Sequence, residues 1–275
     1  MSSNTTSSDT SFWDRRRGVV RSSKGGWIIG KGVFNHGYSM MDDLVGHVSY
    51  MQVIILNATG RLPERRLADW FEAIHICLSW PDPRIWCNQI GALGGTAQTS
   101  VVAATTAGIL SGDSRSYATK SLIEGAEFIQ NALKSYRRGI SIDDILKEEF
   151  AKHGGKPFIM GYARPIAKGD ERVEAMTRTQ ESLELSLGEH QQLASEIENI
   201  LHKKFDESMN INGYISAFLS DRGFTAQEIY RIFAVLITSG VTACYADTRD
   251  KPAESFLPLR CDDIKYRGRP QRSLP

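Results

Sequence analysis

The sequence is poor in cysteine and has no surplus of either charge. Its 33 basic and 32 acidic side chains leave a formal net charge of +1, which gives no basis for bulk attraction to nucleic acid or to a membrane. The cysteines form no CxxC pair, which argues against a disulfide framework or a zinc site and indicates reduced thiols in a cytoplasmic protein. There are four of them: Cys77, Cys87, Cys244 and Cys261.

The sequence pattern also gives no sign of a membrane span or a targeting segment. We find no apolar run long enough to span a bilayer. Residues 1–11 are rich in Ser and Thr and lack an apolar core, so residues 1–24 are predicted to be a disordered lead and not a signal peptide. The rest is ordinary for a globular protein, with 41% hydrophobic and 24% charged residues. A chain of 275 residues suffices for one large domain or two unequal ones.

Most of the chain carries the patterns of helices. Gly25–Gly37 is rich in glycine and predicts a short hairpin or extended piece. Ser49 is a good N-cap for a helix over Tyr50–Ala58, which Gly60 ends. Ile90–Leu110 is rich in small residues, which predicts a buried central pair of helices in close contact. Further helices are predicted from Pro63 to about Leu78, over Tyr117–Arg138, from the cap Ser141 to near His153, within Asp170–Glu207, over Asn210–Leu219, and over Ile229–Tyr245 after the cap Thr225.

The stretch Gly161–Arg172 concentrates positive charge in a loop. Glycine and proline punctuate it, and Arg164, Lys168 and Arg172 follow at a spacing of four. A compact cationic loop before a helix is a plausible seat for phosphate or carboxylate groups. On the local sequence alone, a solvated charged loop is the favoured interpretation.

The segment Ser79–Asn88 is unusual because two prolines and two tryptophans lie within it. The prolines stop the preceding helix and stiffen the connection. Trp80 and Trp86 are either packing anchors of a rigid turn or part of a pocket wall, and the sequence leaves both readings open. Asp82 and Arg84 lie between the tryptophans.

These motifs together resemble the citrate synthase superfamily, especially its shorter citryl-CoA lyase branch. The loop Gly161–Arg172 is similar in frame to the family's Gly-aromatic-Gly-His-Arg/Pro segment, which runs on to a Lys and an Asp-Pro-Arg. His36-Gly37-Tyr38 is similar to its Arg-Gly-Tyr, Asn210–Gly213 to its Asn-Val-Asp-Gly, and Asp262–Tyr266 to its closing Asp-Asp-Ile-x-Tyr. The resemblance spans roughly residues 37–268.

The resemblance implies an all-α, citrate synthase-like fold. It implies a large helical domain from residues 25–140 and 210–275, and a small helical domain from residues 141–209. It also implies a homodimer, because the family works as dimers with sites near the subunit interface.

The chain departs from the family at the positions that carry its chemistry. In the family, a carboxylate removes a proton from an acyl-CoA thioester, one His steadies the enolate, and a second His serves as acid. The matching positions here hold Asn212, Arg115 and Arg164. Asn has no basic lone pair of useful strength and Arg stays protonated, so the ordinary Claisen or retro-Claisen route is not expected. Asp82 lies near the family's Asp-His segment, but no His follows it.

Three interpretations follow from these replacements. The first is an enzyme of altered chemistry on an acyl-CoA or polycarboxylate, in which Asp82 or Asp113 supplies the carboxylate and Arg115 and Arg164 bind anions. The second is a non-catalytic binding or regulatory protein, and the third is a structural subunit that pairs with an active homologue. We place the first ahead, because a decayed pocket need not have acquired two arginines.

The remaining site predictions concern ligand contacts. Lys168 and Arg172 are the candidates for CoA phosphates, and CoA is expected as part of a substrate and not as a tightly bound cofactor. No metal site is predicted. His190 and His202 lie on polar flanks of the helical region and are predicted to be surface residues. The candidate substrate contacts are His36, Arg84 and Ser114.

Overall fold

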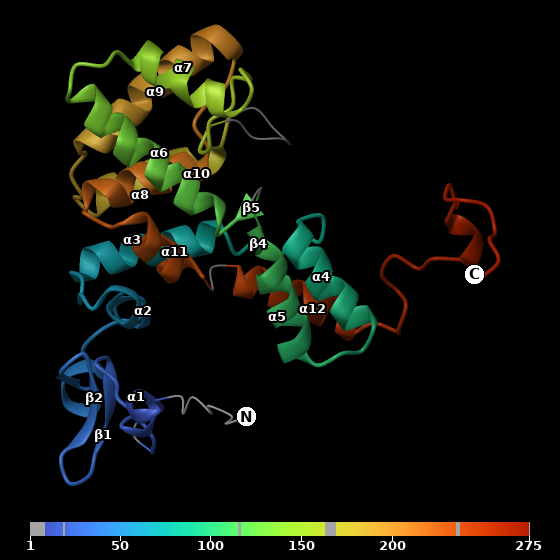
Figure 1. The fold of residues 1–275 in the computed structure, drawn as a ribbon, viewed down its shortest axis with the longest axis horizontal. Helices are drawn as coiled ribbons and strands as arrows, with labels where there is room; N and C mark the ends of the chain where they lie inside the picture. The colour runs from blue at the N-terminus through green and yellow to red at the C-terminus, as the bar shows by residue number, and fades with distance from the viewer. Residues whose placement is uncertain (1–8, 19, 115–116, 163–168, 235–236, 275) are drawn as a thin grey trace, which may run out of the picture. The chain divides into compact units, whose positions relative to one another are not determined.

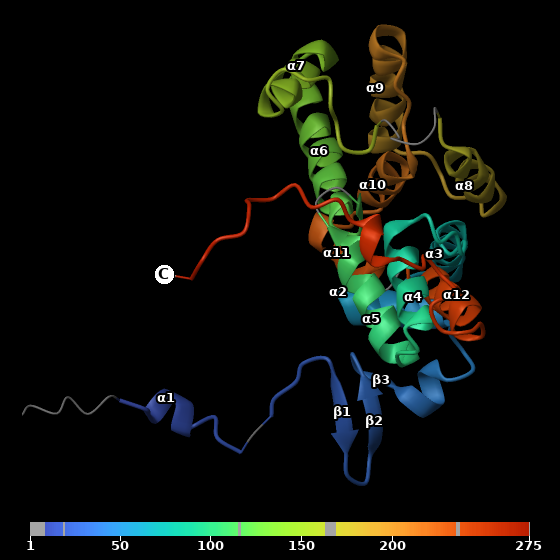
Figure 2. The ribbon, with the colours of Figure 1, turned by 90° about the vertical axis from the view of Figure 1, so that its right-hand side faces the viewer.

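The computed structural model describes residues 9–18, 20–114, 117–162, 169–234 and 237–274 (Figures 1 and 2). Contacts divide the chain into two units, Met1–Arg65 and Arg66–Pro275. Both are described separately below. The division expected from the resemblance, 25–140 with 210–275 against 141–209, stays a prediction.

The first unit, in the part that the structure describes, contains a small antiparallel sheet and one α-helix of more than two turns. Strands β1, β2 and β3 pair in that order, with Trp27 opposite Val33, so the hairpin predicted over 25–37 is confirmed. The predicted cap is also correct, because Ser49 and Gln52 form a capping box at the start of α2. The elements are α1 (Ser11–Asp14), β1 (Gly25–Ile28), β2 (Gly32–Asn35), β3 (Tyr38–Ser39), the π-helix η1 (Met40–Leu44) and α2 (Tyr50–Thr59).

In its described residues, the second unit is mainly helical and contains one two-stranded hairpin. Ser141 caps α7, Asn210 caps α10 and Thr225 caps α11, as the sequence predicts. The elements are α3 (Arg65–Cys77), α4 (Trp86–Thr96), α5 (Val101–Gly112), β4 (Asp113–Ser114), β5 (Tyr117–Ala118), α6 (Ser121–Tyr136), α7 (Ile142–Lys152), α8 (Glu171–Ser182), α9 (Glu189–Phe205), α10 (Ile211–Asp221), α11 (Ala226–Phe233), α12 (Thr238–Arg249) and the 3₁₀ turn η2 (Cys261–Asp263).

Aromatic side chains of α3 and α10 form the centre of the core of the second unit. The rings of Trp70 and Phe218 stack with centroids 3.9 Å apart and planes 8° apart. The ring of Phe71 contacts the rings of Phe224, which precedes α11, and Phe233, which ends it. Trp70, Phe71, Phe218 and Phe233 are fully buried, so they contribute much of the hydrophobic stabilisation of this unit.

Small residues bring α4 and α5 against α12, side by side in Figure 1. A Cβ on Gly91 would lie 2.5 Å from the carbonyl oxygen of Val241, and a Cβ on Gly108 would lie 2.5 Å from the Val241 side chain. The close helix approach predicted for residues 90–110 is therefore confirmed. The expected burial is wrong in part, because the outer face of α5 exposes Val102 and Leu110.

Two predicted long helices are shorter than expected. Residues 117 and 118 form β5 in place of the first helical turn, since they pair with β4, and α6 begins at Ser121. The single helix predicted over 229–245 is also wrong, because α11 ends at Phe233 and α12 begins at Thr238. The helical region predicted over 170–207 consists of α8 and α9. The break is fixed at Gly188, because a Cβ there would lie within 2.6 Å of the carboxylate atoms of Asp221.

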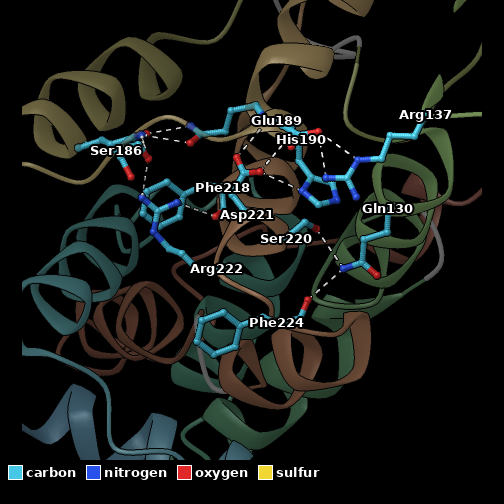
Figure 3. A network of polar contacts seen from close by, with 12 residues as sticks. Gln130, Arg137, Ser186, Glu189, His190, Phe218, Ser220, Asp221, Arg222 and Phe224 are labelled. Carbon is cyan, nitrogen blue, oxygen red and sulfur yellow. Dashed lines mark hydrogen bonds and ion pairs between the residues drawn. The ribbon is translucent and has the colours of Figure 1, made fainter. Parts of the chain in front are cut away.

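A polar network closes this break by joining α9 to the end of α10 (Figure 3). Gly188 offers no side chain to cap α9. Asp221 replaces the cap, accepting hydrogen bonds from the backbone N–H groups of His190 (2.8 Å) and Gln191 (3.1 Å) and from Nδ1 of His190 (2.9 Å). The His190 side chain is only 18% exposed, so its prediction as a surface residue is wrong, whereas His202 is exposed.

One stretch, which includes residues 235 and 236 outside the described ranges, meets the length and composition of a membrane span, contrary to the expectation from the sequence. Ala226–Arg249 covers 24 residues, and half of its most apolar window is buried. The core helices of soluble proteins pass the same test, so this is weak evidence for a membrane segment.

Candidate functional site

Both ends of the cationic loop are anchored at the N-terminal end of α10. At its start, the carbonyl oxygen of Gly161 accepts a hydrogen bond from the backbone N–H of Asn210 (2.9 Å). Gly161 has φ +98°, and a Cβ there would lie 2.7 Å from the Cα of Gly213, so both positions need glycine for this contact. At the end of the loop, Asp170 accepts from the backbone N–H of Ile211 (2.9 Å).

Both ends of the loop therefore lie at the N-terminal end of α10, which is the positive end of the helix dipole. Arg164 and Lys168, the anion-binding candidates within it, lie outside the described residues.

Arg172 is held by a buried carboxylate. Its Nε and Nη2 atoms donate to the two carboxylate oxygens of Asp170, both at 2.7 Å. The Asp170 side chain is fully buried and that of Arg172 is 20% exposed. Burial acts to raise the pKa of Asp170, but the hydrogen bonds from Arg172 and from the backbone of Ile211 outweigh it and hold the pKa below its usual range. The predicted phosphate contact is thus already engaged in an ion pair.

Asn212 forms the middle of a directional hydrogen-bond relay between α10 and α6. Ser216 Oγ donates to Asn212 Oδ1 (3.1 Å), and Asn212 Nδ2 donates to Ser121 Oγ (2.9 Å). Ser121 Oγ in turn donates to the carbonyl oxygen of Ala118 (2.7 Å). Gly125 of α6 makes room, because a Cβ there would lie 2.2 Å from Asn212 Oδ1.

This relay connects Asn212 to the β4–β5 hairpin, where Asp113 pairs with Ala118. The Asp113 carboxylate accepts from the hydroxyl of Tyr230 on α11 (2.9 Å) and from Thr119 Oγ1 (3.4 Å). The hydrogen bond to Asp113 raises the pKa of the Tyr230 phenol, which favours its protonated form. Asp113 is exposed, and neutral hydroxyl groups are its partners among the described contacts.

Asp82 lies in a different setting, on the turn between α3 and α4. Arg84 binds both of its oxygens, with 3.0 Å from Nε to Oδ1 and 2.6 Å from Nη2 to Oδ2. These hydrogen bonds lower the pKa of Asp82, which makes it a weaker base. The turn is pinned by Asn88, which donates to the carbonyl oxygens of Trp80 and Asp82. Trp80 and Trp86 are 42% and 60% exposed, so neither is a packing anchor of the core.

The other predicted contacts are dispersed. Ser114 lies on β4 opposite Tyr117, and Arg115 lies outside the described residues. His36 belongs to the first unit, where it has φ +49° and a buried Nε2 atom without a hydrogen-bond partner.

The structure thus brings together the ends of the cationic loop, Asn212 and the Asp113 hairpin. No described contact joins Asp82 or Arg84 to this group. Sequence reasoning missed Ser121, Ser216 and Tyr230, for which the sequence carries no local signal. Among the described residues, no group of three or more His, Cys, Asp or Glu side chains could hold a metal ion.

Comparison with known proteins identifies the fold. No family model matches the sequence, and no curated protein matches it. Among solved structures, the chain is similar to citryl-CoA lyase from Hydrogenobacter thermophilus, with a TM-score of 0.78 and 23% identity over 94% of this chain and 98% of that one.

Two further structures show the same likeness. ATP citrate lyase from Methanothrix soehngenii, in complex with citrate and coenzyme A, has a TM-score of 0.73 and 16% identity over 95% of this chain and 44% of that one. Citrate synthase from Thermotoga maritima has a TM-score of 0.61 and 16% identity over 83% of this chain and 60% of that one. The chain therefore has the all-α fold shared by citryl-CoA lyase and citrate synthases, as the resemblance implies.

Proposed function

We propose that this chain is a divergent citrate synthase-like enzyme that makes or breaks a C–C bond in an acyl-CoA or polycarboxylate substrate. The observation that carries the proposal is the likeness to citryl-CoA lyase, which covers nearly the whole of both chains. The convergence of the cationic loop, Asn212 and the Asp113 hairpin at the start of α10 supports a site at this place.

Asp113 is the carboxylate that best suits the base of such a reaction. A C–C bond-forming step needs a group that accepts a proton from carbon. Asn212 cannot do so, and Asp82 is neutralised by a two-point contact with Arg84. Asp113 is exposed and bonded to hydroxyl groups, so it has no cation bound across both oxygens among the described contacts and is accessible to a ligand. Tyr230 acts as a positioning residue that fixes the carboxylate.

The arginines of the site would act by fixed charge. Arg115 would stabilise a developing enolate oxygen, and Arg164 would bind a substrate carboxylate through two parallel N–H groups. Neither moves a proton at neutral pH. Arg172 already gives two N–H groups to Asp170, so the CoA phosphates would depend mainly on Lys168. CoA enters as part of the substrate, and no tightly bound cofactor is needed.

The test is hydrogen–deuterium exchange at the methyl group of acetyl-CoA, followed by mass spectrometry with and without oxaloacetate. The same samples are assayed for cleavage of citryl-CoA. We expect exchange or cleavage by the natural sequence, and a loss of about 10²- to 10⁴-fold in Asp113→Asn. Asp247→Asn, an exposed carboxylate on α12 paired with Lys251, is the matched control and should keep its activity. A Tyr230→Phe variant should fall between the two.

A second function, a non-catalytic binding or regulatory subunit, is favoured by one specific observation. The side-chain amide of Asn212 is used on both sides by serines of α6 and α10, which is a structural role. A folded protein that binds CoA or citrate but shows neither exchange nor cleavage would replace the enzyme by this second function.

We also propose that the protein is a cytoplasmic homodimer. The support for the dimer is α5, which is apolar on both faces but buries only one. A second copy that covers Val102 and Leu110 would remove this exposed apolar surface from water. Sedimentation equilibrium should give twice the chain mass, and Val102→Asp with Leu110→Asp should give monomers that remain helical by circular dichroism. A monomeric natural chain would refute the dimer.

A further inference from the structure

A groove of about 400 Å³ runs between α6 and α7, away from the residues that converge on α10. Its floor is apolar and is formed by Phe128, Ala132, Ile145 and Met160. Phe128, Ala132 and Ile145 are buried, so the floor is a fixed part of the core. The α6 residues that line the groove run from Glu124 to Ser135, which corresponds to a length of about 17 Å.

The rim of this groove is acidic. Glu124 and Glu127 of α6 and Glu148 and Glu149 of α7 line it. Glu149 is paired with Lys152 at 2.7 Å. Lys152 also interacts electrostatically with Glu148, so one lysine faces two of the four carboxylates. Like charges gathered on one rim repel one another, so a further cationic occupant would stabilise this surface.

The chain itself contains a segment with the complementary chemistry. The aromatic–arginine segment, Phe12–Arg17, exposes two aromatic rings and three consecutive arginines. Phe12 is 48% exposed and Trp13 is 69% exposed. The guanidinium of Arg16 lies 3.7 Å from the centroid of the Phe12 ring, so charge and apolar surface are presented together. The segment begins in the short helix α1, and Arg16 Nη1 donates to the carbonyl oxygen of Phe12 (3.2 Å), so it is compact enough to lie within a groove of this length.

We propose that the aromatic–arginine segment of a second copy docks in the α6–α7 groove. The aromatic rings cover the apolar floor, and the arginines meet Glu124, Glu127 and Glu148 on the rim. Arginine suits this role because it pairs with carboxylates through two N–H groups and stacks on aromatic rings. The docking rests on the proposed homodimer but not on the proposed chemistry.

The test is a disulfide cross-link between two differently tagged full-length chains, both with Cys261→Ser to remove the exposed native thiol. One carries Ser11→Cys, next to the segment, and the other carries Asn131→Cys, on the wall of the groove. After mixing and mild oxidation, we expect a covalent dimer of unlike chains on a denaturing gel. A single chain with both substitutions should show mainly cross-links between chains, whereas cross-links within the chain would overturn docking of a second copy.

Charge reversal tests whether the contact is the one proposed. Glu124→Lys with Glu127→Lys and Glu148→Lys should reduce the cross-link at least about tenfold, which corresponds to 1.4 kcal/mol. Arg15→Glu, Arg16→Glu and Arg17→Glu in the other chain should restore it. Reversal of Glu196, an exposed carboxylate of α9, is the matched control and should have no effect. A cross-link that survives the groove reversal, or none with the natural charges, would overturn the proposal.

Sedimentation of the charge-reversed chains separates this contact from the dimer itself. We expect the reversed chains to remain dimers, because the apolar face of α5 is unchanged. If the natural chain is a monomer, the dimer fails, and with it the docking. If the chains with charge reversal in the groove are dimers but give no cross-link, the docking is confirmed as a contact distinct from the dimer interface at α5.

Discussion

Replacing Asn212 by Asp introduces a carboxylate into the hydrogen-bond relay between α10 and α6, and the structure predicts a cost in stability. The relay runs in one direction, from Ser216 through Asn212 and Ser121 to the carbonyl oxygen of Ala118. An Asp side chain can still accept from Ser216. It cannot donate to Ser121, so two oxygen atoms face each other at the position of a 2.9 Å hydrogen bond.

The size of the loss in stability depends on how the Ser121 hydroxyl can reorient in the variant. Its hydroxyl can turn to donate to the new carboxylate, but the carbonyl oxygen of Ala118 then loses its donor. If the hydroxyl stays, the carboxylate oxygen faces the lone pairs of Ser121. Either way one part-buried acceptor is left without a hydrogen bond, which costs about 1–3 kcal/mol of the free energy of unfolding. For a chain of this size, the melting temperature should fall by about 2–4 °C for each kcal/mol.

Urea unfolding of Asn212→Asp against the natural chain measures this cost. Because repulsion raises the folded pKa of the new carboxyl, the destabilisation is present above that pKa and shrinks as pH falls through it. Asn131→Asp, on the exposed side of α6, makes the same chemical change and should cost less than about 0.5 kcal/mol. Equal stability of Asn212→Asp and the natural chain, with no dependence on pH, would refute the relay.

Three further variants test the contacts around the site. Asp221→Asn should lower the free energy of unfolding by about 1–3 kcal/mol in urea. Burial raises the pKa of Asp221, but hydrogen bonds from His190 and the start of α9 outweigh it and hold the pKa down; the difference should therefore be full above about pH 4 and vanish as pH falls through the depressed folded pKa. Gly188→Ala should lower the melting temperature, because its Cβ would lie 2.3 Å from the Asp221 carboxyl carbon. An unchanged melting temperature would contradict this clash. Arg172→Ala removes the two hydrogen bonds of its guanidinium to the buried carboxylate of Asp170 and should lower the free energy of unfolding by about 1–3 kcal/mol, and Arg172→Ala with Asp170→Ala should recover part of that loss.

Local signals predicted four helix starts correctly. Ser49, Ser141, Asn210 and Thr225 each act as N-caps where the sequence indicates. Capping depends on residues within one turn of the helix, so a single sequence contains the information. The spacing of apolar residues predicted most of the helices, and the family motifs predicted the all-α fold.

Contacts between distant segments could not be predicted. The β4–β5 pairing shortens the expected helix over 117–138, and Asp221 turns His190 inward across 31 positions of sequence. Neither event has a signature in the residues around it. Of the candidate site, the sequence indicated Asn212 and the cationic loop, while the hydrogen bonds that occupy Asn212 and Arg172 are visible only in three dimensions.

The most direct test of the proposed site is calorimetric titration with CoA, because every catalytic proposal depends on a ligand bound beside the cationic loop. We expect saturable binding, weakened about tenfold to a hundredfold in Lys168→Ala, which removes one charged phosphate contact. Lys156→Ala, an exposed lysine before the loop, is the matched control and should bind as the natural chain does. Absence of binding by the folded protein, or equal affinity in both variants, would contradict a CoA site at this loop.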